Sequence, residues 1–513
     1  MLFKDIYSTI LLIFCTVIVS ASIFDSNTQM SKNTHPSVAY IILWLVLIWL
    51  AMVEGGQASL VGLPPIRMNL YEHSHPTAHK IMKVVNTGDN LDRYLMGRQF
   101  MVLALVFVEN LAGHTSDSDK KVLGLPKFVN SIFFDTGLGI FFMTAMIGKI
   151  SAQVNASRCM LDYTDNLFAY FTFQCARIIE FSGLLHCCYP VQMLFAKASG
   201  QVLESKDAPR TKGQDVFFWS RVVVSAGILV FAFCVTLSAL FQGKTTMWAG
   251  VPAWLSVLLF FSFMAVVGML EGMQIAFFAV AKMSETDRAK SPWAKRTCDL
   301  LFKGEGRNLP GFMIGRQMCV TLCFFIVARV TSVEIEDGES NIFNAPDGLQ
   351  GFYNTGLLGA LITTICASIT WQLIASAFPM AFLSTPLTYV LLRFCLFLEW
   401  TGLCQGSWVV ARVHRKLVGF KRDEVYVGSS QERAATSNED VQIFSAGKMI
   451  PVPMLPESFG KREITMGSIH ELEIDLKQHR DDVDKRLRIL NEKKKALEAS
   501  ESTNAKDIED GVD

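Results

Sequence analysis

Long apolar runs, each about as long as a membrane crossing requires, fill the first 412 residues of this chain. A hydrocarbon core of about 30 Å needs about 20 largely apolar helical residues, and ten runs reach this length. The sequence therefore predicts an all-α polytopic membrane protein with about ten transmembrane helices. Their approximate limits are 6–24, 38–62, 95–113, 131–153, 167–196, 217–241, 253–282, 311–332, 353–378 and 384–412.

The composition supports this class and argues against several others. Of the 513 residues, 51% are hydrophobic and 18% are charged, against roughly 25% charged in ordinary globular chains. The formal net charge is zero, so no global basic field attracts nucleic acid. No Ser-His-Asp, metal-ligand or phosphate-binding pattern occurs within the apolar runs. We therefore expect neither an enzyme nor a cofactor or metal centre.

The two halves of the chain carry the same motifs in the same order. Five pairs of segments match at nearly one offset, which makes chance a poor explanation and indicates an internal duplication. The pairs are Glu54-Gly55-Gly56-Gln57 with Glu271-Gly272-Met273-Gln274, Gly97-Arg98-Gln99 with Gly315-Arg316-Gln317, Asp135-Thr136-Gly137 with Asn354-Thr355-Gly356, Gln153 with Gln372, and Glu180 with Glu399.

Each half would contain five of the ten runs, and this odd number has a consequence for orientation. Two adjacent five-span copies enter the membrane from opposite sides, which gives the inverted-repeat plan of many secondary transporters. A duplication kept for packing alone is the alternative. The predicted divisions are a first five-helix repeat at 1–200, an inter-repeat loop at 201–216, a second five-helix repeat at 217–412, a polar linker at 413–465, a coiled-coil-like helix at 466–500 and an acidic disordered tail at 501–513.

The predicted helix at 466–500 has mixed features. Ser468 and Glu471 form a capping-box pattern at its start. One apolar residue then recurs every seven positions, as in a coiled coil, but the second apolar row is weak. Both a solvated single helix and a cytoplasmic coil that self-associates or binds a partner fit. The apolar row consists of Ile469, Leu476, Val483, Leu490 and Leu497.

Basic residues give conflicting signals about orientation. Cytoplasmic loops carry an excess of Lys and Arg, so Arg412, Arg415 and Lys416 after the tenth run favour a cytoplasmic C-terminus. With ten crossings, however, the basic loop at 282–310 then lies outside, and the acidic loop around Glu336 lies inside. We predict that both termini are cytoplasmic, in a multi-pass protein of the plasma membrane.

The repeated motifs place charged residues within apolar runs. A carboxylate at the centre of a membrane helix costs about 2.5–3.5 kcal/mol on insertion scales, so Glu54 and Glu271 need partners. Arg98 and Arg316 can supply them with a rigid fork of donors, either within each half or across the halves. Such pairs either shape a binding site or only lock helices together.

Four glutamines accompany these charges: Gln57, Gln99, Gln274 and Gln317. Glu-Gly-x-Gln places its Glu and Gln at positions i and i+3, on one helix face, with a glycine that permits close backbone approach. Each acid can be balanced by an Arg, which leaves the amides for the solute. An amide can both donate and accept a hydrogen bond, so the pattern favours a neutral, hydroxyl-rich solute.

These motifs closely resemble those of the diatom silicon transporters, the family that takes up silicic acid. Cys159-Met160-Leu161-Asp162 is similar to a further tetrapeptide of many members, and the resemblance covers almost the whole chain. It implies sodium-coupled uptake of neutral silicic acid, with the four glutamines binding its hydroxyls. The residues that would shape the site or meet the ion are Glu54, Arg98, Glu271, Arg316, Asp135 and Asn354.

Three functions are compatible with these features. The favoured one is a secondary active transporter that works by alternating access of two inverted repeats. A passive channel for small neutral hydroxylated solutes and a silicon-sensing receptor are the alternatives. The expected partners are silicic acid, sodium and the lipid bilayer, with self-association or a partner protein at 466–500.

Overall fold

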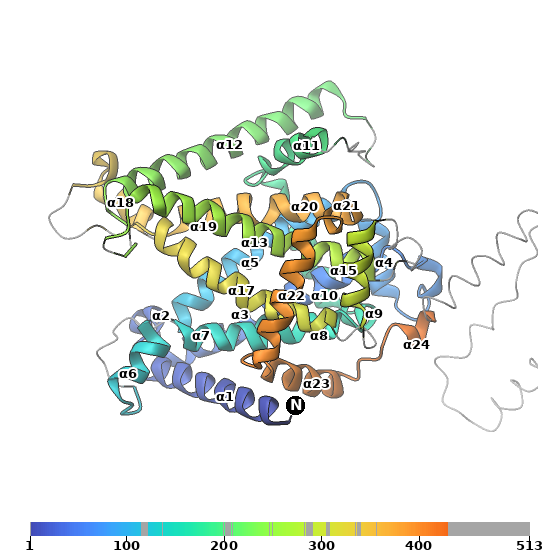
Figure 1. The fold of residues 1–513 in the computed structure, drawn as a ribbon, viewed down its shortest axis with the longest axis horizontal. Helices are drawn as coiled ribbons and strands as arrows, with labels where there is room; N and C mark the ends of the chain where they lie inside the picture. The colour runs from blue at the N-terminus through green and yellow to red at the C-terminus, as the bar shows by residue number, and fades with distance from the viewer. Residues whose placement is uncertain are drawn as a thin grey trace, which may run out of the picture. The chain divides into compact units, whose positions relative to one another are not determined.

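A computed structural model gives the fold of the chain (Figure 1). The chain divides into two compact units, Met1–Ser437 and Asn438–Asp513, of which only the first lies within the described part. The predicted coiled-coil helix and acidic tail lie outside the described residues. The structure describes residues 2–428 except 114–121, 136, 199, 201–206, 208, 246, 249, 282, 284–290, 304–307, 334, 336–339 and 355.

Helices form the regular structure of the described part, which has no strand beyond an isolated bridge between Thr245 and Val333. The all-helical prediction is confirmed. The elements of the first half are α1 Leu2–Phe24, α2 Gln29–Asn33, α3 Pro36–Gly62, η1 Met68–Leu70, α4 Pro76–Val85, α5 Asn90–Gly113, α6 Lys127–Asn130, η2 Ser131–Asp135, α7 Leu138–Met143, η3 Thr144–Ile150, α8 Ser151–Ala156, α9 Met160–Thr164, α10 Leu167–Phe181 and α11 Cys188–Ala198.

The second half repeats this order. Its elements are α12 Lys212–Phe241, α13 Ala253–Ala281, α15 Pro292–Leu301, α17 Asn308–Thr331, η4 Ile342–Asn344, α18 Asp347–Asn354, α19 Leu357–Thr363, η5 Thr364–Ile369, α20 Thr370–Ala377, α21 Pro379–Leu383, α22 Pro386–Thr401 and α23 Gly406–Val418, followed by α24 Glu424–Val427.

Seven helices of the described part are long and apolar enough to cross a membrane, or up to nine if each of two bent pairs is one span. The bent pair at the end of the second half, α22 with α23, turns by 84°. These candidates overlap nine of the ten predicted runs. The fifth run, 167–196, instead forms the short helices α10 and α11, with a turn at Gly183 (φ 79°) between them. The ten-helix count is therefore not confirmed.

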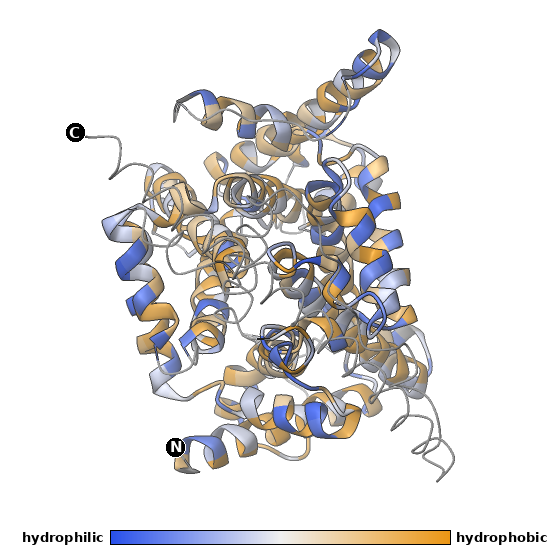
Figure 2. Cartoon of the chain, turned by 90° about the vertical axis from the view of Figure 1, so that its right-hand side faces the viewer, coloured by the Kyte–Doolittle hydropathy of each residue, from blue (hydrophilic) through white to orange (hydrophobic). Residues whose placement is uncertain are grey.

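Large apolar side chains are exposed on the outer helices, among them Ile10, Ile41, Val223 and Leu258. Figure 2 shows apolar residues, in orange, along helices at the outside of the molecule. Extensive exposed apolar surface on long helices is what a lipid environment requires. The chain is therefore a multi-pass membrane protein, as the apolar runs predict.

Corresponding positions of the two halves have the same local backbone. A π-helix follows α7 in the first half (η3) and α19 in the second half (η5). The helices α7 and α19 each begin after a glycine in the left-handed region, Gly137 (φ 69°) and Gly356 (φ 74°). Because π-helices are rare and often mark functional sites, their paired occurrence supports the duplication and points to the region around them.

The first helix of each half is hydrogen-bonded to the segment between the last two helices of the other half. Ser8 Oγ on α1 donates to the Leu403 carbonyl at 2.6 Å and accepts from the Gly406 N–H at 2.8 Å. The equivalent Ser225 on α12 accepts from the Cys187 N–H at 3.1 Å. Figure 1 shows α1 and α12 on opposite sides with the other long helices between them. The two halves are therefore interlocked.

The two halves also run in the same direction. Asp207, shortly before α12, pairs with Arg93 and accepts from the Asp89 N–H at 3.2 Å, so α12 begins at the same end as α5. Since α1, α3 and α5 alternate in direction, α1 begins at that end as well. The inverted orientation is not confirmed, because the fifth predicted run does not form a single crossing helix and the second half re-enters from the same side.

Candidate functional site

Two glycines bring the helices of the candidate site into close contact. A Cβ added at Gly97 on α5 would overlap the carbonyl oxygen of Ala176 on α10. The equivalent Gly315 on α17 meets the carbonyl oxygen of Cys395 on α22 in the same way. The backbones can approach this closely only because glycine has no side chain. The arginine that follows each glycine is thereby held at a fixed place in the helix bundle.

In the first half, this arginine closes an ion pair in the protein interior. Arg98 Nη2 lies 2.6 Å from Glu54 Oε2, and both side chains are buried. Gln153 Nε2 donates to the same carboxylate oxygen at 2.9 Å. Arg98 Nη1 also donates to Gln99 Oε1 at 2.7 Å. One guanidinium thus neutralises the acid and orients the neighbouring amide.

The second half repeats this arrangement. Arg316 Nη1 lies 2.9 Å from Glu271 Oε1, and Gln372 Nε2 donates to Glu271 Oε2 at 3.0 Å. Arg316 Nη2 donates to Gln317 Oε1 at 3.3 Å. The ion pairs therefore form within each half and not across the halves. Gln372 Nε2 also lies 3.4 Å from Gln99 Oε1, which joins the two clusters.

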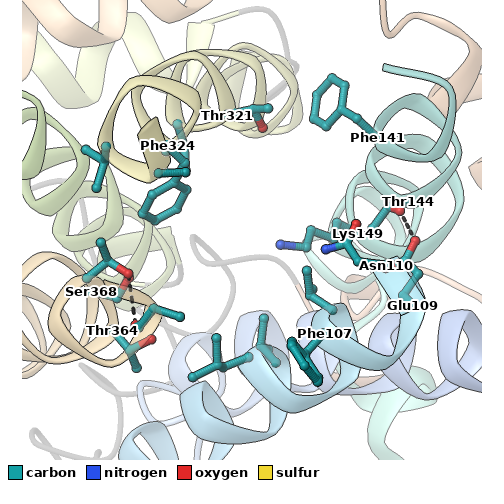
Figure 3. Close-up of a pocket in the computed structure, with 18 of the residues that line it drawn as sticks. Phe107, Glu109, Asn110, Phe141, Thr144, Lys149, Thr321, Phe324, Thr364 and Ser368 are labelled. Carbon is teal, nitrogen blue, oxygen red and sulfur yellow. Dashed lines mark hydrogen bonds between the residues drawn. The ribbon is translucent and has the colours of Figure 1, made fainter. Parts of the chain in front are cut away.

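Both clusters line one cavity of about 610 Å³. Its wall includes the two ion pairs with Gln99 and Gln317, and it extends along α5 and α17 towards Gly137 and Gly356. Figure 3 shows Lys149 and Asn110 on one side of the cavity, facing Thr364 and Ser368 across it. The motifs of the two halves therefore contribute to a single cavity.

The four glutamines predicted from the sequence lie in two kinds of position. Gln99 and Gln317 line the cavity, whereas Gln57 and Gln274 are not among its lining residues and are fully buried. Both amide atoms of Gln57, and Nε2 of Gln274, have no hydrogen-bond partner within the described part. A buried amide without a partner costs about 1–3 kcal/mol, so these two groups are available to a ligand or to another conformation.

The predicted ion ligands at the Thr-Gly steps do not form a described cluster. The Asp135 side chain lies outside what the structure describes. Asn354 is exposed, its Oδ1 accepts from Gln350 Nε2 at 2.8 Å, and it is not among the lining residues. Gly137 and Gly356, which follow these residues, do line the cavity.

Three lining residues of the first half were not identified from the sequence. Lys149 Nζ on η3 lies 3.8 Å from Glu54 Oε1. Glu109 on α5 is buried in the wall, and its Oε1 lies within hydrogen-bond distance of Thr144 Oγ1. A charged residue within an apolar run was the available signal, because every such charge needs a partner. The second half has no charged residue at the positions that correspond to Lys149 and Glu109.

Asp162, the last residue of the Cys-Met-Leu-Asp segment, joins loops away from the cavity. Its Oδ1 lies 3.0 Å from His75 Nε2, and its Oδ2 accepts from the Lys421 N–H at 2.5 Å. Burial raises the pKa of the Cys159 thiol to about 12, which keeps it protonated and makes it a poor metal ligand. This segment holds the chain after α23 against the loops that follow α3 and α8.

Comparison with known proteins gives one result for the whole chain. A family model described as silicon transporter matches residues 1–513. No curated protein and no solved structure matches the chain.

Proposed function

The chain belongs to the silicon transporter family, and on this premise we propose that it takes up neutral silicic acid together with sodium by alternating access. The observation that carries this proposal is the cavity shared by both motif pairs. One site between two similar halves is the arrangement expected of a secondary transporter. Transport of silicon itself follows from the family and the membrane-spanning architecture.

The charges of the site favour an uncharged solute. Glu54 is paired with Arg98 and Glu271 with Arg316, so the clusters carry no net charge. A neutral solute with several hydroxyl groups needs hydrogen-bond donors and acceptors rather than a counterion. Silicic acid is such a solute, because it is a very weak acid with four hydroxyls.

The arginines set which part of each amide meets the solute. Gln99 Oε1 accepts from Arg98 and Gln317 Oε1 accepts from Arg316. The Nε2 group of each glutamine is then directed to donate to a solute oxygen. Two donors from opposite halves of the cavity would hold one tetrahedral molecule between them.

Gln57 and Gln274 take part in a second conformation in this proposal. Both amides are buried outside the cavity lining, and each has at least one atom without a hydrogen-bond partner among the described residues. A movement of one half against the other would bring them to the solute as the site turns to the opposite face. Rocking of parallel repeats about a central site is an established route to alternating access.

The distribution of charge supports a cytoplasmic location for both termini. Arg412 Nη2 lies 3.3 Å from Asp5 Oδ2, so the two ends of the membrane region meet. The basic helix α15 follows α13 at the same end of the bundle, because the halves run in one direction. With both termini inside, the basic segments are cytoplasmic and the conflict of the ten-crossing topology disappears.

The test is uptake of radioactive germanic acid, a chemical analogue of silicic acid, into proteoliposomes that contain the purified chain. We expect saturable uptake, stimulated several-fold by an inward sodium gradient, and counterflow into vesicles preloaded with silicic acid. Uptake that is unaffected by sodium would refute the coupling. Uptake that never saturates and shows no counterflow would indicate a passive channel.

A sensor can be separated from a transporter by removal of the C-terminal unit. Truncation after Gly428 keeps the hydrogen bonds that Asp423 and Lys421 make to the α9 region. A transporter should keep its rate of uptake in this variant. Loss of uptake in a folded truncated protein would show that the C-terminal unit is required for transport.

A further inference from the structure

Among the described residues, Glu54 and Glu271 in the cavity wall each have an ion-pair partner, whereas Glu109 in the same wall has none. Its side chain is 1% exposed, and Oε2 has no hydrogen-bond partner in the described part of the chain. It lies on α5, three turns beyond Arg98, on the same wall of the cavity. A buried carboxylate at membrane depth needs a compensating charge or a proton.

Two acceptors lie beside the Thr144 hydroxyl: Glu109 Oε1, and the Ile140 carbonyl oxygen, which also accepts the Thr144 backbone N–H. Thr144 Oγ1 lies within hydrogen-bond distance of Glu109 Oε1 and also of the Ile140 carbonyl oxygen, the latter at 2.7 Å. A hydroxyl has one proton, so it can donate to only one of these two acceptors. Three oxygens therefore converge at the first residue of the π-helix η3. Figure 3 shows the contact between Thr144 and Glu109. Such a group of oxygens is the ligand set that hard cations prefer.

We propose that Glu109, Thr144 and the Ile140 carbonyl bind one monovalent cation of the sodium class. This inference rests on the proposed function and gives its coupling ion a place. A single carboxylate balances one positive charge, whereas divalent cations take six or more oxygens and commonly several carboxylates. The equivalent position in the second half cannot supply such a ligand, because Ala328 stands there and also lines the cavity.

Lys149 connects this site to the solute. Its ammonium group faces the cavity 3.8 Å from Glu54 Oε1, and it is the cation that acts electrostatically on Glu109. The equivalent position in the second half is Ser368. A cation at Glu109 repels Lys149 towards Glu54, which belongs to the Arg98–Gln99 cluster. Binding of the cation thereby alters the cluster that holds the solute.

Two readouts on the full-length chain test the proposal. The first is the sodium concentration that gives half-maximal germanic acid uptake in proteoliposomes. The second is the rise in melting temperature with sodium in detergent, because an ion that binds only the folded state stabilises it by mass action. In Glu109→Gln we expect the half-maximal sodium concentration to rise about tenfold or more and the sodium-dependent melting shift to vanish.

Further variants keep the test decisive. Thr144→Val should weaken sodium dependence several-fold and serves if Glu109→Gln fails to fold. Thr236→Val removes a buried hydroxyl on α12 away from the cavity and should leave sodium dependence unchanged. Wild-type sodium dependence in both Glu109→Gln and Thr144→Val would overturn the site. A wild type without any sodium dependence would instead refute the coupling, and a proton-driven uptake lost in Glu109→Gln would assign a proton to Glu109.

Discussion

At the scale of single residues, the site is organised by arginines whose donors are already hydrogen-bonded within the protein. Each arginine donates hydrogen bonds to a carboxylate and to the side-chain oxygen of the next glutamine. The N–H groups of that glutamine are then the part that can donate to the solute. A preorganised donor gains more from a solute than a mobile one, because less side-chain entropy is lost on binding. The pairs therefore stabilise the bundle and prepare the site at once.

Substitution of the cavity glutamines should separate binding from transport. Gln99→Ala or Gln317→Ala removes a donor to the solute, and we expect equilibrium binding of germanic acid to weaken about fivefold to tenfold. Gln57→Ala, outside the cavity wall, should leave this binding nearly unchanged while slowing uptake. Scintillation proximity binding and proteoliposome uptake measure the two effects. Equal loss of binding in all three variants would contradict this assignment of the glutamines.

The sequence predicts the partners of the site better than their arrangement. That Glu54 and Glu271 each need an arginine follows from the cost of a buried charge. Whether the pairs form within or across the halves depends on helix packing, and so does the position of Gln57 behind the cavity. Glu109 carried a usable signal as a carboxylate within an apolar run.

At the scale of helices, close glycine contacts set the geometry of the site. Gly97 and Gly315 let α5 touch α10 and let α17 touch α22 at the level of the ion pairs. The helix α17 is thereby fixed against α22 of the tenth predicted run, and α5 against α10 of the fifth. That run has enough apolar residues for a span, but the left-handed turn at Gly183 divides it, and composition alone does not reveal this.

A methyl group at these contacts should disrupt the bundle. Gly97→Ala and Gly315→Ala place a Cβ against a backbone carbonyl that cannot move without shifting its helix, and we expect a loss of about 3 kcal/mol or more of stability. Gly227→Ala on α12 is the matched control, since its Cβ would meet nothing within 4 Å. Melting temperature and monodispersity in detergent measure the effect. Melting curves of Gly97→Ala and Gly227→Ala that coincide would refute the contact.

At the scale of the whole molecule, the direction of the halves decides which segments share a face. Counting apolar runs gives ten crossings and opposite directions, whereas the contacts of Asp207 place the start of α12 at the same end of the bundle as the start of α5. The duplication itself is predictable from the motifs. Its orientation is not, because it depends on whether one run of average hydrophobicity crosses the bilayer or turns back.

Cysteine accessibility can test this direction. Lys295→Cys on α15 and Lys416→Cys on α23 should be labelled from the same side of the membrane, and Gly348→Cys on α18 from the other. Labelling of intact and permeabilised cells with an impermeant maleimide measures this, with the parent chain as background for the native thiols. Labelling of Lys295→Cys and Lys416→Cys from opposite faces would restore the inverted topology.

The contacts of Ser8 have a consequence for how the protein is made. Its partners, Leu403 and Gly406, are synthesised almost four hundred residues later. The first helix therefore enters the membrane long before its final neighbours exist, and contacts between residues so distant in sequence form slowly. Until then, α1 is in contact with lipid or with an insertion chaperone instead of its final neighbours. These contacts can form only after residue 406 has been synthesised, so nascent chains that stop earlier lack them and should be prone to degradation.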